Sequence, residues 1–113
     1  MVVKIIKTKV EKINQTITNH DMSHSLVIGS IYIVYGIEVN TENIYYIIFN
    51  GNHLLFIPAQ MFEIIDNSIP DSWKLKFDRN ILTLYPELFY LEYFFDRFSD
   101  YDDDLRDEFE KIK

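Results

Sequence analysis

Residues 28–39 read IGSIYIVYGIEV, and residues 44–49 read IYYIIF. In both stretches apolar side chains occupy both alternating faces, which is typical of strands that are central in a sheet or strongly curved. Residues 40–43 form a four-residue loop between them, and Asn50-Gly51 directly after the second stretch is a strong signal for a tight turn. We therefore expect an antiparallel β-meander here, around which the rest of the chain is arranged.

Short strand patterns continue on both sides of the meander. They are expected at residues 3–13, 54–57, 62–66 and 73–77. In the last of these, Trp73, Leu75 and Phe77 alternate with lysines, which predicts a strand with one buried face. The polar segment 14–25 is expected to be a loop. Five or six short antiparallel strands joined by turns predict a small curled sheet or barrel within residues 3–77.

The hydrophobic period becomes helical after Pro86, a residue that fits the first turn of a helix. We expect a first helix at 86–98 and a second at 100–112, with Ser99 as the N-cap and Asp102 in the capping-box position. A chain of 113 residues is too short to divide into two well-packed units. The sequence thus predicts one α+β domain, mainly β over 3–77 and helical over 86–112.

The composition excludes several kinds of chemistry. The chain contains no cysteine, which removes disulfides, cysteine zinc sites and thiol nucleophiles. Lysines interrupt the apolar residues of segment 1–7, and no run approaches the roughly 20 apolar residues that cross a bilayer. We therefore expect a cytoplasmic protein without a membrane partner.

The net charge of −7 is unevenly distributed. Residues 1–80 hold seven Lys or Arg against eight Asp or Glu, whereas residues 81–113 hold four against ten, a net charge of −6. Nucleic-acid binding requires basic residues to displace counterions, so the acidic end disfavours that partner. It favours a basic protein partner or serves solubility alone.

We find no pattern of catalytic or metal-binding residues. No glycine-rich phosphate loop and no nucleophile elbow is present. His20 and His24 are four residues apart, but their polar segment predicts a loop rather than a metal-binding helix. His53 is interpreted as a polar turn residue. We predict no catalytic, cofactor or metal site, and therefore a protein that is not an enzyme.

The candidate partner-binding residues lie in the C-terminal part. Three aromatic residues fall outside the apolar arc of the first predicted helix, namely Phe89, Tyr90 and Tyr93. Two interpretations stay open: the second helix or the sheet covers them, or they form an aromatic patch that binds a protein. Carboxylates would rim that patch, at Asp96, Asp100, Asp102, Asp103, Asp104, Asp107 and Glu108.

Several segments carry a family resemblance. They are Val27 to Ile37, Tyr45 to Ile48, Pro58 to Asp66, Ile69 to Trp73 and Leu84 to Phe89, within a span of roughly 27–98. In these segments the chain resembles small bacterial immunity proteins encoded beside polymorphic or contact-dependent growth-inhibition toxins. The resemblance implies an SH3-like β-barrel with C-terminal helices, but it assigns no toxin-binding residue.

The resemblance also implies a function. The chain would bind and neutralise a cognate toxin, a basic nuclease domain whose active or substrate-binding site it occludes. The acidic residues would enter the basic cleft of such a nuclease. Two other functions stay open, namely a non-catalytic regulatory or adaptor module with an SH3-like barrel and a structural homodimer subunit.

Overall fold

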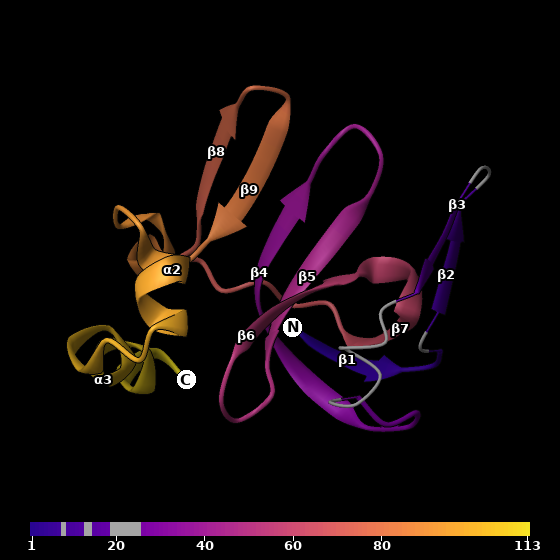
Figure 1. Ribbon diagram of the computed structural model, residues 1–113, viewed down its shortest axis with the longest axis horizontal. Helices are drawn as coiled ribbons and strands as arrows, with labels where there is room; N and C mark the ends of the chain where they lie inside the picture. The colour runs from indigo at the N-terminus through magenta and orange to yellow at the C-terminus, as the bar shows by residue number, and fades with distance from the viewer. Residues whose placement is uncertain (8, 13–14, 19–25) are drawn as a thin grey trace.

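The computed structural model describes residues 1–7, 9–12, 15–18 and 26–113 (Figure 1). The strands are β1 (Val2–Ile5), β2 (Lys9–Lys12), β3 (Gln15–Thr18), β4 (Ile31–Val39), β5 (Ile44–Phe49), β6 (Leu54–Pro58), β7 (Phe62–Asp66), β8 (Lys74–Asp78) and β9 (Ile81–Tyr85). The helical segments are the 3₁₀ turns η1 (Ala59–Met61) and η2 (Glu87–Tyr90) and the α-helices α2 (Phe94–Ser99) and α3 (Asp103–Ile112). The predicted α+β class, a sheet followed by two C-terminal helices, is confirmed.

Seven strands form an antiparallel sheet built around β4. β5 pairs along one side of β4 and β6 pairs with β5, which confirms the predicted meander. The other side of β4 is shared, because residues 31–33 pair with β1 and residues 37–39 pair with β9. β7 then extends the sheet beyond β1, and β8 extends it beyond β9. On this side of β4 the sheet therefore divides into two branches, β1 with β7 and β9 with β8, and it does not close into a barrel.

Two strands lie where the sequence predicts none. β3 pairs with β2 in a separate two-stranded sheet, although segment 14–25 is expected to be a loop. β9 lies beyond residue 77, the expected end of the β region, and its pairing with β4 joins the β8–β9 hairpin to the sheet.

Strand alternation directs the side chains of β4, β5 and β6 into two apolar clusters. Neighbouring residues on β5 therefore belong to different clusters. Ile48 packs in one cluster, and Ile47 packs in the other. The cluster of Ile48 also contains Val3, Ile5, Val34, Ile57 and Met61. The cluster of Ile47 is mainly aromatic, with Tyr85, Phe89, Phe94, Phe98, Leu105 and Phe109. The C-terminal segments η2, α2 and α3 therefore cover the sheet face of Ile47 (Figure 1).

The predicted first helix at 86–98 is not continuous in the structure. Residues 87–90 form η2, the backbone is extended at Leu91, and Tyr93 adopts left-handed φ and ψ of 57° and 25° before α2 begins. In one continuous helix, Phe89 and Phe94 would point about 140° apart. The break instead stacks their rings with centroids 4.8 Å apart. Burial of both aromatic rings in one cluster thus overrides the helical pattern.

The second predicted helix is confirmed, but its cap is not Ser99. Ser99 is the last residue of α2, and Tyr101 has a left-handed φ of 61°. The Asp102 N–H donates to the Arg97 carbonyl and the Tyr101 N–H to the Phe98 carbonyl, the two bonds of a Schellman motif. Asp102 is the N-cap of α3, since its side chain accepts a hydrogen bond from the Leu105 N–H.

Candidate protein-binding surface

The β8–β9 hairpin extends from the body of the protein in the same direction as the β4–β5 turn (Figure 1). Its two-residue turn, Arg79 and Asn80, has positive φ angles of 51° and 63°. Positive φ at both positions is the requirement of a type I′ turn, whose twist matches that of the strands it joins. Among the described strands, β9 alone pairs the hairpin with the rest of the sheet, through residues 82–84 and the matching part of β4.

One face of this hairpin is apolar. Residues that oppose each other in the register lie on the same face, and Leu75 opposes Leu84 while Phe77 opposes Leu82. Leu82 in turn opposes Val39 of β4, and Val39 opposes Ile44 of β5, so the apolar row of Phe77 continues across the sheet. We call this surface the apolar sheet face, formed by Leu75, Phe77, Leu82, Leu84, Val39 and Ile44.

The apolar sheet face is open to solvent at its outer strand. Leu75 is 65% exposed and Phe77 is 69% exposed. The alternation of residues 73–77 predicts a buried face, and this prediction is wrong for β8. Only Trp73, just before the strand, packs against the cluster of Ile48. β8 extends past that cluster, and η2, α2 and α3 pack on the opposite side of the sheet.

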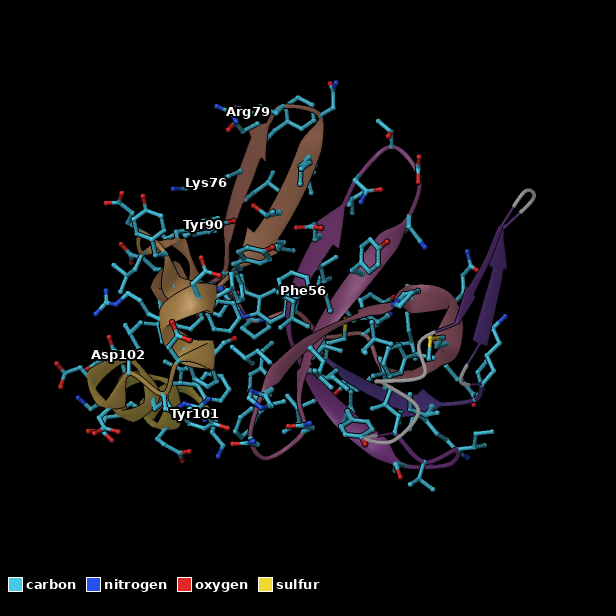
Figure 2. All side chains as sticks on the ribbon, viewed as in Figure 1. Phe56, Lys76, Arg79, Tyr90, Tyr101 and Asp102 are labelled. Carbon is cyan, nitrogen blue, oxygen red and sulfur yellow. The ribbon has the colours of Figure 1, made fainter. Side chains whose placement is uncertain are left out.

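The opposite face of the hairpin is polar and packs against η2. The Tyr90 hydroxyl donates to the Lys74 carbonyl at 2.7 Å and lies 2.8 Å from Thr83 Oγ1. The Lys76 ammonium lies over the Tyr90 ring, 4.3 Å from its centroid (Figure 2). Tyr90 thus fixes the base of the hairpin through its hydroxyl and its ring.

A groove follows the outer edge of β8. It is lined by Lys74, Leu75, Lys76, Glu87, Tyr90 and Leu91. The β8 backbone forms one side and η2 with the residue after it forms the other. Leu91 is exposed, although the helical pattern predicts it in the apolar arc. The groove therefore has apolar and charged lining beside a strand edge.

The predicted aromatic patch does not form one surface. Phe89 is 3% exposed and belongs to the aromatic cluster, so of the two interpretations left open it is covered rather than part of a surface patch. Tyr90 is half-buried against the hairpin, and Tyr93 is 68% exposed. Of these three aromatic residues, Tyr93 alone offers most of its side chain to a partner.

The predicted carboxylates lie on α2, α3 and the corner between them. All but one are exposed, namely Asp96, Asp100, Asp103, Asp104, Asp107 and Glu108. Asp102 is half-buried and pairs with the Arg97 guanidinium at 2.9 Å. The Leu105 N–H and the Arg97 guanidinium hold the pKa of Asp102 below its usual range. Asp102 is therefore part of the helix corner rather than a free acidic group.

Polar side chains meet in two other places. His53 Nε2 lies 3.1 Å from Asn52 Nδ2, which also donates to the Tyr101 hydroxyl at 3.0 Å. The Tyr85 hydroxyl donates to Glu38 at 3.3 Å. Burial raises the pKa of Tyr85, and the Glu38 carboxylate raises it further. Neither His53 nor Glu38 is among the residues that line the groove along β8.

Within the described residues, no three His, Asp or Glu side chains gather where they could hold a metal ion. Residues 20 and 24, the two histidines weighed as metal ligands, lie outside the described residues. The described helices include none that is long and apolar enough to cross a membrane.

Sequence reasoning missed the apolar sheet face as a candidate site. One signal for β9 is present in the sequence, because Leu82 and Leu84 alternate with Thr83. The turn before it is hard to recognise, because Arg79-Asn80 is an unusual pair for a type I′ turn. No family model, no curated protein and no solved structure matches this chain. The resemblance to immunity proteins therefore stays a prediction.

Proposed function

We propose that this chain is a non-catalytic binding protein of the immunity type, which binds one cognate toxin and blocks its active or substrate-binding site. The observation that carries the binding role is the exposure of Leu75 and Phe77 on a projecting hairpin. Isolated exposed apolar residues are common on protein surfaces, but a contiguous apolar face on a sheet marks an interaction site. An SH3-like fold and a cytoplasmic location are part of this proposal.

The composition of the surface favours a protein as the partner. Large apolar side chains at the centre of a contact supply affinity, and charged residues around them supply orientation. Phe77 and Leu75 provide the apolar centre, while Lys76 and Arg79 lie on the same hairpin (Figure 2). Such a surface binds by burial and shape without any chemical step.

The acidic helices support a basic toxin as the partner. Exposed carboxylates on α2 and α3 create a negative field that accelerates association with a basic cleft. A nuclease presents such a cleft, because it must bind phosphate. In this proposal the apolar sheet face holds the toxin and the acidic helices steer it.

The test is co-expression with any toxin domain that proves to be encoded beside this gene. The wild-type chain is expected to restore growth, and Leu75→Ser with Phe77→Ser is expected to abolish the rescue. Ile65→Ser is the control, because Ile65 is also an exposed apolar strand residue, 52% exposed, and lies on β7 away from the hairpin. Failure of the wild-type chain to protect against any neighbouring toxin would reject the immunity role.

The steering role has a separate test. Asp103, Asp104 and Asp107 are each changed to Lys, and Asp102 is left unchanged because it caps α3. The association rate with the toxin should fall and its salt dependence should weaken, while the dissociation rate changes little. An unchanged association rate in correctly folded variants would remove the acidic helices from the mechanism.

A further inference from the structure

We infer that the partner contributes an extended segment that pairs with the free edge of β8, and that its side chains alternate between acidic and apolar. This inference rests on the proposed binding function and specifies its geometry. The observations that carry it are an unpaired strand edge, a groove along that edge and the charge pattern of the strand. Together they describe a site for β-strand addition.

The register identifies which backbone groups are free. Within the described residues, β8 pairs with β9 alone. Asp78 and Ile81 flank the two-residue turn, so they form a hydrogen-bonded pair, and Lys76 with Thr83 forms the next such pair. The N–H and C=O groups of Leu75 and Phe77 consequently point away from β9. These two residues present the donors and acceptors that an added strand needs.

The groove gives that strand a place to lie. Its volume is about 480 Å³; Tyr90 and Leu91 line it on the η2 side, and Lys74, Leu75 and Lys76 line it on the β8 side. Leu91 follows η2 directly and has an extended backbone. A strand added to β8 would therefore contact η2 on one side and continue the apolar sheet face on the other.

The side chains of β8 determine which segment fits. Lys74 and Lys76 lie on the η2 side, and Leu75 and Phe77 lie on the apolar sheet face. Among the described residues, neither lysine ammonium has a carboxylate within 4.0 Å. Of the described residues that line the groove, Glu87 alone is acidic, against these two lysines. An added strand with acidic residues opposite the two lysines and apolar residues opposite Leu75 and Phe77 would make favourable cross-strand pairs on both faces.

A second copy of this chain fits the edge less well than a foreign strand. Two β8 strands paired antiparallel about Lys76 would place this lysine directly opposite its own copy, a destabilising pair. The charge pattern therefore selects an acidic and apolar segment of another protein.

The test uses a synthetic ten-residue peptide that alternates Glu and Val, with a matched peptide that alternates Lys and Val. Binding is followed by NMR chemical-shift change and by amide exchange in the full chain. The Glu peptide should bind with about tenfold preference over the Lys peptide, because two attractive cross-strand pairs replace two repulsive ones. The amides of Leu75 and Phe77 should gain protection from exchange.

Two sets of variants make the test specific. Phe77→Pro removes an outward N–H without breaking a β8–β9 hydrogen bond, so it should abolish peptide binding, whereas Phe77→Ala keeps the N–H and should retain measurable binding. Lys74→Glu with Lys76→Glu should reverse the preference towards the Lys peptide, and this variant decides the question if the proline variant unfolds. Equal binding of both peptides, shifts away from β8, or concentration-dependent β8 shifts without peptide would overturn the inference.

The same variants separate this inference from the proposed function. Suppose that Leu75→Ser with Phe77→Ser abolishes toxin neutralisation, whereas Phe77→Pro and the double Glu variant preserve it. The binding function then stands and strand addition is wrong. If the Glu peptide binds as expected but no neighbouring toxin is neutralised, strand addition stands and the immunity role is wrong.

Discussion

The absence of a side chain at Gly36 allows β4 and β9 to pack against the aromatic cluster. A Cβ at this position would lie 2.9 Å from Tyr85 Cδ1 and 3.1 Å from Ile47 Cδ1. Tyr85 is buried there, with its ring 5.9 Å from Phe89 and 5.1 Å from Tyr90. The sequence marks Gly36 only as an interruption in an apolar strand, whereas the structure shows that the Tyr85 ring occupies its space.

At the residue scale we predict that Gly36→Ala destabilises the protein. The added methyl group must displace the Tyr85 ring, and overpacking of this kind lowers the free energy of unfolding by about 1–3 kcal/mol. Urea unfolding measures the change. In a Tyr85→Leu background the same substitution should cost less, because the rigid ring is gone. An equal cost in both backgrounds would show that Tyr85 is not the cause.

At the element scale, the corner between α2 and α3 depends on a left-handed tyrosine and a charged cap. Tyr101 takes the position that glycine usually occupies in a Schellman motif. Its ring lies 5.8 Å from His53, and the Arg106 guanidinium lies 4.3 Å from its centroid. These contacts hold a conformation that is unfavourable for a residue with a side chain. Asp102 then starts α3 as its N-cap.

We predict that Asp102→Asn lowers the melting temperature at neutral pH but not in strong acid. Asn keeps the capping oxygen and loses the charge that pairs with Arg97. The folded-state pKa of Asp102 lies below its usual value, chiefly because the Leu105 N–H donates to it. Its stabilising effect is therefore present above the usual aspartate pKa and is lost as the pH falls through the folded-state value.

The measurement is thermal unfolding of both proteins over a pH series. The difference between the melting temperatures of wild type and variant should shrink as the solution becomes acidic. Asp100→Asn, at an exposed carboxylate of the same corner, is the control and should change the melting temperature less. A difference that stays constant across the series would show that the charge of Asp102 has no part in the cap.

At the scale of the whole molecule, Arg106 connects the helices to the sheet. Its guanidinium donates to the Phe98 carbonyl at 2.7 Å and 3.1 Å, and to the Asn52 carbonyl in the β5–β6 turn at 2.8 Å. The same group lies over the Phe98 ring, 4.1 Å from its centroid. One side chain thus joins α3, the end of α2 and the sheet.

We predict that Arg106→Lys lowers the free energy of unfolding by about 1–3 kcal/mol, because a lysine ammonium cannot make this set of planar hydrogen bonds and ring contacts. Denaturant unfolding measures this loss. Lys111→Met removes an exposed ion pair with Glu108 on the same helix and is expected to have a smaller effect. Equal effects of both substitutions would argue against a bridging role for Arg106.

Local patterns were sufficient to predict the meander and the last helix. Strands β4, β5 and β6 are joined by short turns, so the alternation of apolar residues and the Asn50-Gly51 turn specify their pairing. α3 likewise follows from the apolar spacing of Leu105 and Phe109. In these segments the residues that determine the structure are neighbours along the chain.

The candidate site and the first helix depended on contacts between distant residues. The alternation in β8 shows that its two faces differ, but it does not specify which face another element will cover. Because η2 and α2 pack on the side of Tyr85, Phe89 becomes buried, and no described element covers Leu75 and Phe77. The same packing breaks the helix between Tyr90 and Phe94. Burial of aromatic area in one shared cluster outweighs local helical propensity, and only the folded chain brings those aromatic residues together.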